Sequence, residues 1–177
     1  PTRLPVLSTL IRGLFGLSML ILASLAWADD SNFLNAREAY NKGQMERFAR
    51  AASKISDTYP LRAYLDYWQL KSGDPEPQEM EAFIGRYPDS PLAERFRLEL
   101  ARLYGESNEW EPFYRWASQL SKPDNEIRCH ALRGQVLAGQ ANAIPEGVQI
   151  YRTGRDQPSS CGRLFELLFE RGNLRQE

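Results

Sequence analysis

A cysteine beside a histidine, at Cys129 and His130, is the pair in this sequence that most resembles a nucleophile and its base. Such a pair works only when the base can take the thiol proton across a hydrogen bond. Both residues fall within a helical pattern, and neighbouring residues on a helix point about 100° apart. The two side chains therefore do not face each other, and we expect no catalytic residue here.

Metal and cofactor chemistry lacks its usual residues as well. The chain has two cysteines and a single histidine, which are too few for a zinc site of the common kinds. It also contains no glycine-rich phosphate loop, no HExxH, no Gly-x-Ser-x-Gly and no calcium-binding loop. We predict no metal ligands and no cofactor.

Carboxylates are the remaining candidates for acid–base chemistry. A glutamic acid that cleaves a glycan must lie in an apolar pocket to keep its proton near neutral pH. The sequence pattern instead places the glutamates on solvated helix faces and in turns, at Glu94, Glu99, Glu106, Glu109 and Glu111. No catalytic carboxylate is predicted.

Composition points to a folded domain with no attraction to nucleic acid. The 177 residues carry 22 basic and 23 acidic side chains, a net charge of −1, and 42% of them are hydrophobic. A chain of this length can bury a real core. The even charge balance excludes the basic surface that nucleic acid requires.

Residues 1–28 have the pattern of a cleaved secretory signal peptide. Arg3 and Arg12 precede an apolar run from Leu14 to Leu25, and Ala26-Trp27-Ala28 is a small-x-small cleavage site. The run is short for a membrane span, so no stable anchor is expected after cleavage. An uncleaved anchor is the alternative. The chain also begins without Met, and we expect its N-terminus to be incomplete.

Export to an oxidising compartment would allow the two cysteines to form a disulfide. An even pair in an oxidising compartment is a disulfide candidate, here Cys129 with Cys161. Closing a loop of that size is worth about 3.7 kcal/mol in the chain-entropy model. Two buried free thiols are the alternative.

The stretch Tyr59–Leu70 organises the expected fold. Pro60 suits the start of a helix. One apolar face follows at i, i+3, i+4 and i+7, formed by Leu61, Tyr64, Leu65 and Trp68. A second apolar face places this helix between neighbours. The alternative is that its aromatic rings stack on a sugar.

Breaks at glycine and proline divide the rest into short helices, and no stretch alternates as a strand does. The expected helices are Phe33–Asn41, Met45–Ser56, Leu61–Ser72, Gln78–Arg86, Pro91–Tyr104, Trp110–Leu120, Glu126–Ala138, Pro145–Thr153 and Cys161–Phe169. Short helices joined by tight turns predict an all-α α-solenoid of antiparallel helical hairpins without a sheet. A closed helical bundle is the alternative.

Several of these stretches resemble one family in the same order. They are Tyr59-Pro60-Leu61 with Tyr64-Leu65 and Tyr67, the segment Phe83–Leu103, Glu109-Trp110, and the cysteine segments Cys129–Gln140 and Pro158–Phe165. Together, over about residues 32–172, they are similar to the N-terminal helical region of the soluble lytic murein transglycosylases. Those are periplasmic enzymes that cleave peptidoglycan strands.

The resemblance implies that residues 29–177 are the N-terminal part of a superhelical, U-shaped domain. In the family this domain supports a C-terminal lysozyme-like domain, which cuts the MurNAc–GlcNAc bond without water and leaves a 1,6-anhydro end. The family's catalytic Glu lies in a Glu-Ser segment followed by Gly-Leu-Met-Gln. Glu106-Ser107 has the dipeptide, but Gly-Leu-Met-Gln is absent.

The resemblance therefore assigns no catalytic residue to this chain, and the catalytic domain is expected in cis beyond Glu177. Peptidoglycan strands are the expected partner of the full-length enzyme. The alternative is a non-enzymatic periplasmic helical-repeat protein that serves as a binding or assembly scaffold.

Overall fold

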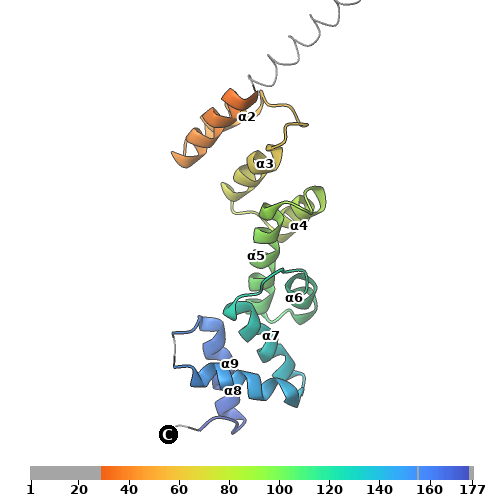
Figure 1. The fold of residues 1–177 in the computed structure, drawn as a ribbon, viewed down its shortest axis with the longest axis vertical. Helices are drawn as coiled ribbons and strands as arrows, with labels where there is room; N and C mark the ends of the chain where they lie inside the picture. The colour runs from red at the N-terminus through yellow and green to blue at the C-terminus, as the bar shows by residue number, and fades with distance from the viewer. Residues whose placement is uncertain (1–28, 155, 176–177) are drawn as a thin grey trace, which may run out of the picture. The chain divides into compact units, whose positions relative to one another are not determined.

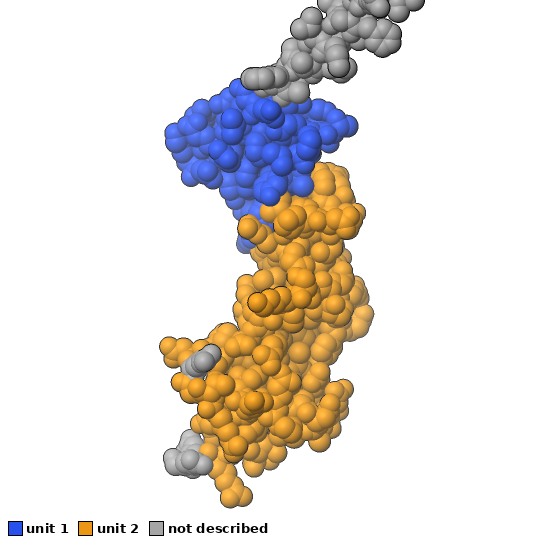
Figure 2. Space-filling model, viewed as in Figure 1, with its two compact units in different colours: residues 1–74 blue, residues 75–177 orange. Residues whose placement is uncertain are grey.

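The computed structural model describes residues 29–154 and 156–175, and within them every regular element is a helix (Figure 1). The predicted signal peptide, residues 1–28, lies outside the described residues. In the part that is described, no helix is both long enough and apolar enough to cross a membrane. The chain divides into two compact units, residues 1–74 and 75–177 (Figure 2).

The first unit contains a helix over residues 29–41, followed by α2 (Met45–Ala52) and α3 (Arg62–Lys71). The predicted start of the first helix at Phe33 is wrong, because residues 29–32 are already helical. Tyr59 stabilises the first turn of this helix by donating a hydrogen bond of 2.7 Å to Asp30. The α2 helix ends before Ser56, and the following turn buries Ile55 in the core of the unit.

Trp68 joins α3 to the first helix. Its ring stacks on Phe33 at 5.6 Å and on Tyr40 at 5.4 Å between centroids. Phe33 and Tyr40 are two helical turns apart, about 10.5 Å, so the indole lies between them. Ala36 is fully buried on the same helix. Trp68 therefore serves packing, and its faces are not free to stack on a sugar.

The prediction that α3 lies between neighbours on two sides is wrong at Leu61 and Tyr64. These side chains are 38% and 36% exposed, while Leu65 is the buried residue of the helix. The first helix packs on α3 through Trp68, one turn after Tyr64. The exposed ring of Tyr64 makes a tilted contact with Trp68, at 5.9 Å between centroids.

The second unit is a run of helices that pack on near neighbours in sequence. Its elements are α4 (Pro77–Arg86), α5 (Pro91–Ser107), α6 (Trp110–Ala117), α7 (Asn125–Leu137), the short 3-10 helix η1 (Ala141–Ala143), α8 (Ile144–Arg152) and α9 (Ser159–Glu170). The helices α5, α7 and α9 contact one another in that order, with α6 and α8 packed beside them. This confirms the predicted all-α arrangement of short helical hairpins.

Capping residues start two of these helices. Ser90 caps α5 by accepting a hydrogen bond from the amide of Leu92, and Pro91 occupies the first helical position. Asp124 caps α7 in the same way through the amide of Ile127, at 3.0 Å. The polar side chains thus satisfy amides that the first turn of a helix leaves unpaired.

The predicted end of the helix at Tyr104 is wrong. The α5 helix continues through Ser107, and the reversal falls at Asn108, which has a φ of 65°. Asparagine tolerates this left-handed conformation better than most residues. Gly105 lies inside the helix instead, because a neighbouring helix packs against it.

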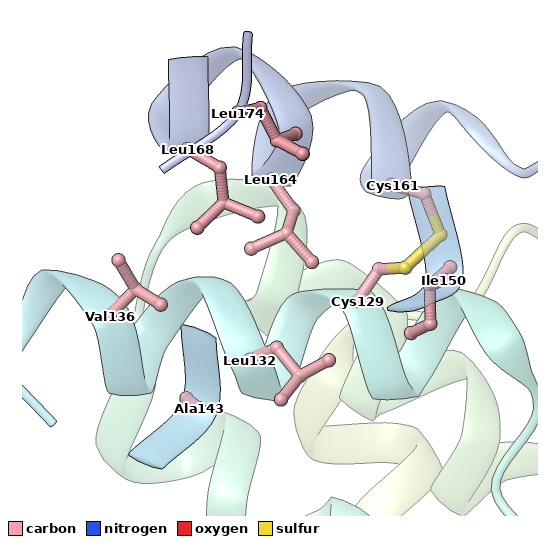
Figure 3. Close-up of a cluster of buried hydrophobic side chains, with 9 residues drawn as sticks. All are labelled: Cys129, Leu132, Val136, Ala143, Ile150, Cys161, Leu164, Leu168 and Leu174. Carbon is pink, nitrogen blue, oxygen red and sulfur yellow. A yellow bond between two sulfur atoms is a disulfide. The ribbon is translucent and has the colours of Figure 1, made fainter. Parts of the chain in front are cut away.

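A second core surrounds a disulfide between Cys129 of α7 and Cys161 of α9 (Figure 3). The two Cα atoms are 4.9 Å apart, and both cysteines are fully buried. Aliphatic side chains from four elements and the C-terminal segment pack around the bridge: Leu132, Val136, Ala143, Ile150, Leu164, Leu168 and Leu174. The bridge therefore joins α7 to α9 where their apolar faces meet.

Removing this bridge should lower the stability of the chain. We expect a Cys129→Ala and Cys161→Ala double variant to lose about 2–4 kcal/mol of unfolding free energy, because the unfolded chain regains the entropy of an open loop. Urea denaturation followed by circular dichroism measures the loss. Reductant should destabilise the parent chain and leave the double variant unchanged. A midpoint that does not move in the parent chain would contradict the expectation.

Candidate functional site

The glutamates singled out in the sequence lie where they meet solvent or basic partners. Glu111 pairs with Arg115 at 2.7 Å on an exposed face of α6. Glu94 accepts two hydrogen bonds from Ser121, from its amide at 2.8 Å and its hydroxyl at 2.7 Å. The hydrogen bond from the Ser121 amide is the main reason that the pKa of Glu94 lies below its usual value. A general acid for glycan cleavage needs a raised pKa, so Glu94 is unsuited to that task.

The other acidic candidates do not converge on one place. Glu106 and Glu109 are exposed near the end of α5, where Glu109 accepts a hydrogen bond from Ser107 at 2.8 Å. Among the described residues, no group of three or more histidine, cysteine or acidic side chains could hold a metal ion. The described part of the chain thus brings none of the sequence candidates into a reactive arrangement.

Cys129 and His130 point in different directions, as the helix geometry requires. Cys129 faces α9, where its sulfur is bonded to Cys161. His130 faces α5 and α6, where it is fully buried against Gly105 and Phe113. The pair therefore cannot act as a nucleophile and its base.

His130 belongs to a polar cluster at the end of α5, which we call the His130 cluster. Its members are Gly105, Asn108, Trp110, His130 and Arg133. They come from α5, α6, α7 and the turn at Asn108. This cluster is the most unusual chemical environment in the second unit, because it combines a buried imidazole with a buried guanidinium.

Gly105 makes the close approach of α5 and α7 possible. A Cβ atom at this position would lie 2.7 Å from Cγ of His130 and 2.9 Å from its Cδ2. Those distances are shorter than van der Waals contact allows, and the imidazole is confined on its other side by Phe113, at 6.0 Å between ring centroids. A side chain at position 105 would therefore push the two helices apart.

Arg133 caps the end of α5. The residue is 5% exposed, and its guanidinium donates a hydrogen bond of 3.2 Å to the carbonyl of Gly105 and another to Oδ1 of Asn108. It also lies 5.2 Å from the centre of the Trp110 ring, a cation–π distance. Arg163 of α9 donates to the next carbonyl, that of Glu106, at 3.3 Å. Two cations thus meet the negative end of the α5 dipole.

Gly134 allows α6 to pack closely against α7. A Cβ atom on Gly134 would be 2.6 Å from the hydroxyl of Tyr114 and 2.8 Å from Trp110. The Tyr114 hydroxyl donates to the carbonyl of Ala131 on α7, at 2.9 Å. Burial raises the pKa of Tyr114 and lowers that of Arg133. The hydroxyl of Tyr114 and the guanidinium of Arg133 thus hold helices together.

A shallow polar hollow also lies between α7 and α8. Its side chains already bind one another, through Arg128 and Glu146 at 2.6 Å and through Asn125 and Gln157 at 3.2 Å. The hollow is open to solvent, and these groups have protein partners. It provides no assembled site.

The described residues define the class of protein: an all-α chain of stacked helical hairpins, cross-linked by one disulfide. No protein-family model matches the chain. The soluble lytic murein transglycosylase of Escherichia coli K12 is 26% identical to it over 165 residues, which is 86% of this chain and 24% of that protein. The protein of the same name from Salmonella typhimurium LT2 is 25% identical over 162 residues.

Solved structures agree on the fold. A complex of the 70-kDa soluble lytic transglycosylase with bulgecin A has a TM-score of 0.63, at 20% identity over 83% of this chain. The crystal structure of the 70-kDa enzyme from Escherichia coli has a TM-score of 0.62, at 21% identity over 84%. The soluble lytic murein transglycosylases are thus homologues of this chain, which confirms the resemblance seen in the sequence. The chain spans about a quarter of the length of these relatives, 24%.

The contact at Gly105 predicts a specific sensitivity. Gly105→Ala should lose about 1–3 kcal/mol of unfolding free energy, because its methyl group has no room beside His130. Thermal or urea denaturation measures the change. The matched control is Gly85→Ala in α4, where a Cβ meets nothing within 4 Å. That variant should gain about 0.5–1 kcal/mol from helix propensity. Equal effects at the two sites would show that crowding at Gly105 is unimportant.

Proposed function

We propose that residues 29–177 form the N-terminal part of the helical scaffold of a lytic murein transglycosylase. The observation that carries the proposal is the match to proteins of that name over 86% of this chain but only 24% of theirs. The solved neighbours share the helical fold over the same share of their length. In this proposal the scaffold belongs to a superhelical, U-shaped domain.

Cleavage itself is assigned to a C-terminal domain of the parent enzyme, in cis. That domain would break the MurNAc–GlcNAc bond of peptidoglycan and leave 1,6-anhydro ends, so that glycan strands are the partner of the whole enzyme. The chemistry of this chain supports the assignment. Glu94 is held below its usual pKa, and Glu111 is neutralised by Arg115 on the surface. Neither carboxylate is placed to donate a proton to a glycosidic oxygen.

The proposed location is the periplasm, reached through removal of residues 1–28. The basic, apolar and small-x-small pattern of those residues supports export. A buried disulfide between Cys129 and Cys161 supports an oxidising compartment, because such bridges are rare where thiols are kept reduced.

The second candidate is a non-enzymatic periplasmic scaffold built from the same helical repeats. It is supported by the way each unit encloses its own hydrophobic core. A protein of this kind would bind a partner on the surface of its helical stack and would need no catalytic domain.

Two measurements test these proposals: the first tests whether this segment is a scaffold at all, and the second separates the two candidates. Purified residues 29–177 should release no 1,6-anhydro muropeptides from peptidoglycan, as followed by mass spectrometry, because no acid in the proposed scaffold is set to cleave the bond. Release by this segment alone would overturn the scaffold assignment.

The second measurement is the reading frame downstream of codon 177. Further helical pairs, followed by Glu-Ser and Gly-Leu-Met-Gln, are expected for the transglycosylase. The enzyme encoded by that longer frame then serves as the positive control for cleavage. A stop codon directly after position 177 would favour the non-enzymatic scaffold.

A further inference from the structure

The imidazole of His130 is enclosed without a hydrogen-bonding partner. It is 0% exposed, and among the described residues neither Nδ1 nor Nε2 has a partner. It is also the only histidine in the chain, so a change of pH between 5 and 7.5 acts on few other groups. The neutral ring leaves one donor and one acceptor unpaired in this enclosure, whereas the charged ring would leave two donors and a positive charge without a partner.

The charged groups around His130 do not offer it a counterion. Arg133 of α7 and Arg163 of α9 are cations, and they oppose a positive charge on the ring. Asp124, before α7, would favour that charge, but its carboxylate already accepts from Arg102 at 2.7 Å and from the Ile127 amide.

The remaining neighbours are no better placed. Glu106 of α5 also favours the charged ring but is exposed to solvent, and α6 contributes the uncharged ring of Phe113. Burial is the largest cause of the lowered pKa of His130, followed by Arg133. His130 therefore binds a proton most readily when its ring is exposed to solvent.

We propose that the contact of α5 and α6 with α7 at His130 is an acid-sensitive joint, which opens on protonation of His130 while α7 stays attached to α9. The two sides of α7 differ in what holds them. Toward α9 stands the covalent Cys129–Cys161 bridge within an apolar core. Toward α5 stand His130, packed on Gly105, the hydrogen bonds of Arg133, and the partly exposed ion pairs of Arg102 with Asp124 and Glu126. A charge on His130 therefore weakens the α5 side. This inference does not depend on the proposed function.

The direction of the pH effect follows from proton binding. The open joint gives His130 a pKa near its ordinary value of 6.5, and the closed joint lowers that pKa. The open form thus binds more protons, and its population grows as the pH falls below 6.5. For each unit by which the pH falls, the population of the open form rises by up to about tenfold, until the closed form also binds the proton.

Hydrogen exchange of the full chain, followed by mass spectrometry and corrected for the intrinsic pH dependence of exchange, tests the joint. Between pH 7.5 and 5, protection of the amides in residues 100–117 should fall by about fivefold or more, a conservative share of the tenfold per unit. Protection in α9 should change less than twofold. His130→Gln and His130→Leu, which cannot be charged, should show no such fall.

Three results would overturn the joint: protection of residues 100–117 that is equal at the two pH values, the same fall in both His130 variants, or a parallel fall in α9. Should the variants unfold, NMR titration of the parent chain decides. The Gly105 amide should move with the same midpoint as the His130 ring, and a Gly105 signal that stays fixed while the ring titrates would overturn the inference.

Discussion

The close approach of α5 and α7 at Gly105 is the contact on which the second unit depends. The absence of a side chain at that position lets the His130 ring lie against the helix, with Phe113 on its other side. The same approach brings Arg133 to the carbonyl of Gly105, where it satisfies the end of α5. Steric fit and helix capping are thus coupled, because a wider spacing would lose both.

The disulfide extends this arrangement to the next helix. Cys129 precedes His130, so α7 presents the bridge to α9 on one side and the imidazole to α5 on the other. One helix therefore organises two contacts of different strength, a covalent one in an aliphatic core and a packed polar one. Helical stacks take their stability from such neighbour contacts, and the stability need not be the same along the stack.

In the first unit, aromatic rings hold the helices together. Trp68 fills the space between Phe33 and Tyr40, and Tyr59 ties the unit to Asp30. Burial and the hydrogen bond to Asp30 raise the pKa of Tyr59 to about 12, so the phenol stays protonated as a donor at neutral pH. The aromatic residues that invite a sugar-binding interpretation in the sequence are thus occupied mainly with one another. Their contacts are those of a hydrophobic core, in which the rings hold helices together.

The sequence by itself determined most of the helices, the all-α class and the family resemblance, and proline marked the start of α5 at Pro91. These depend on local periodicity and capping, which a short window contains. Only the tertiary structure decided that Gly105 lies inside α5, that Leu61 and Tyr64 face solvent, and that His130 and Arg133 meet Gly105 and Asn108. The contacts of His130 and Arg133 with α5 and its end join residues 25 to 28 positions apart, and no local pattern records which helix packs on which.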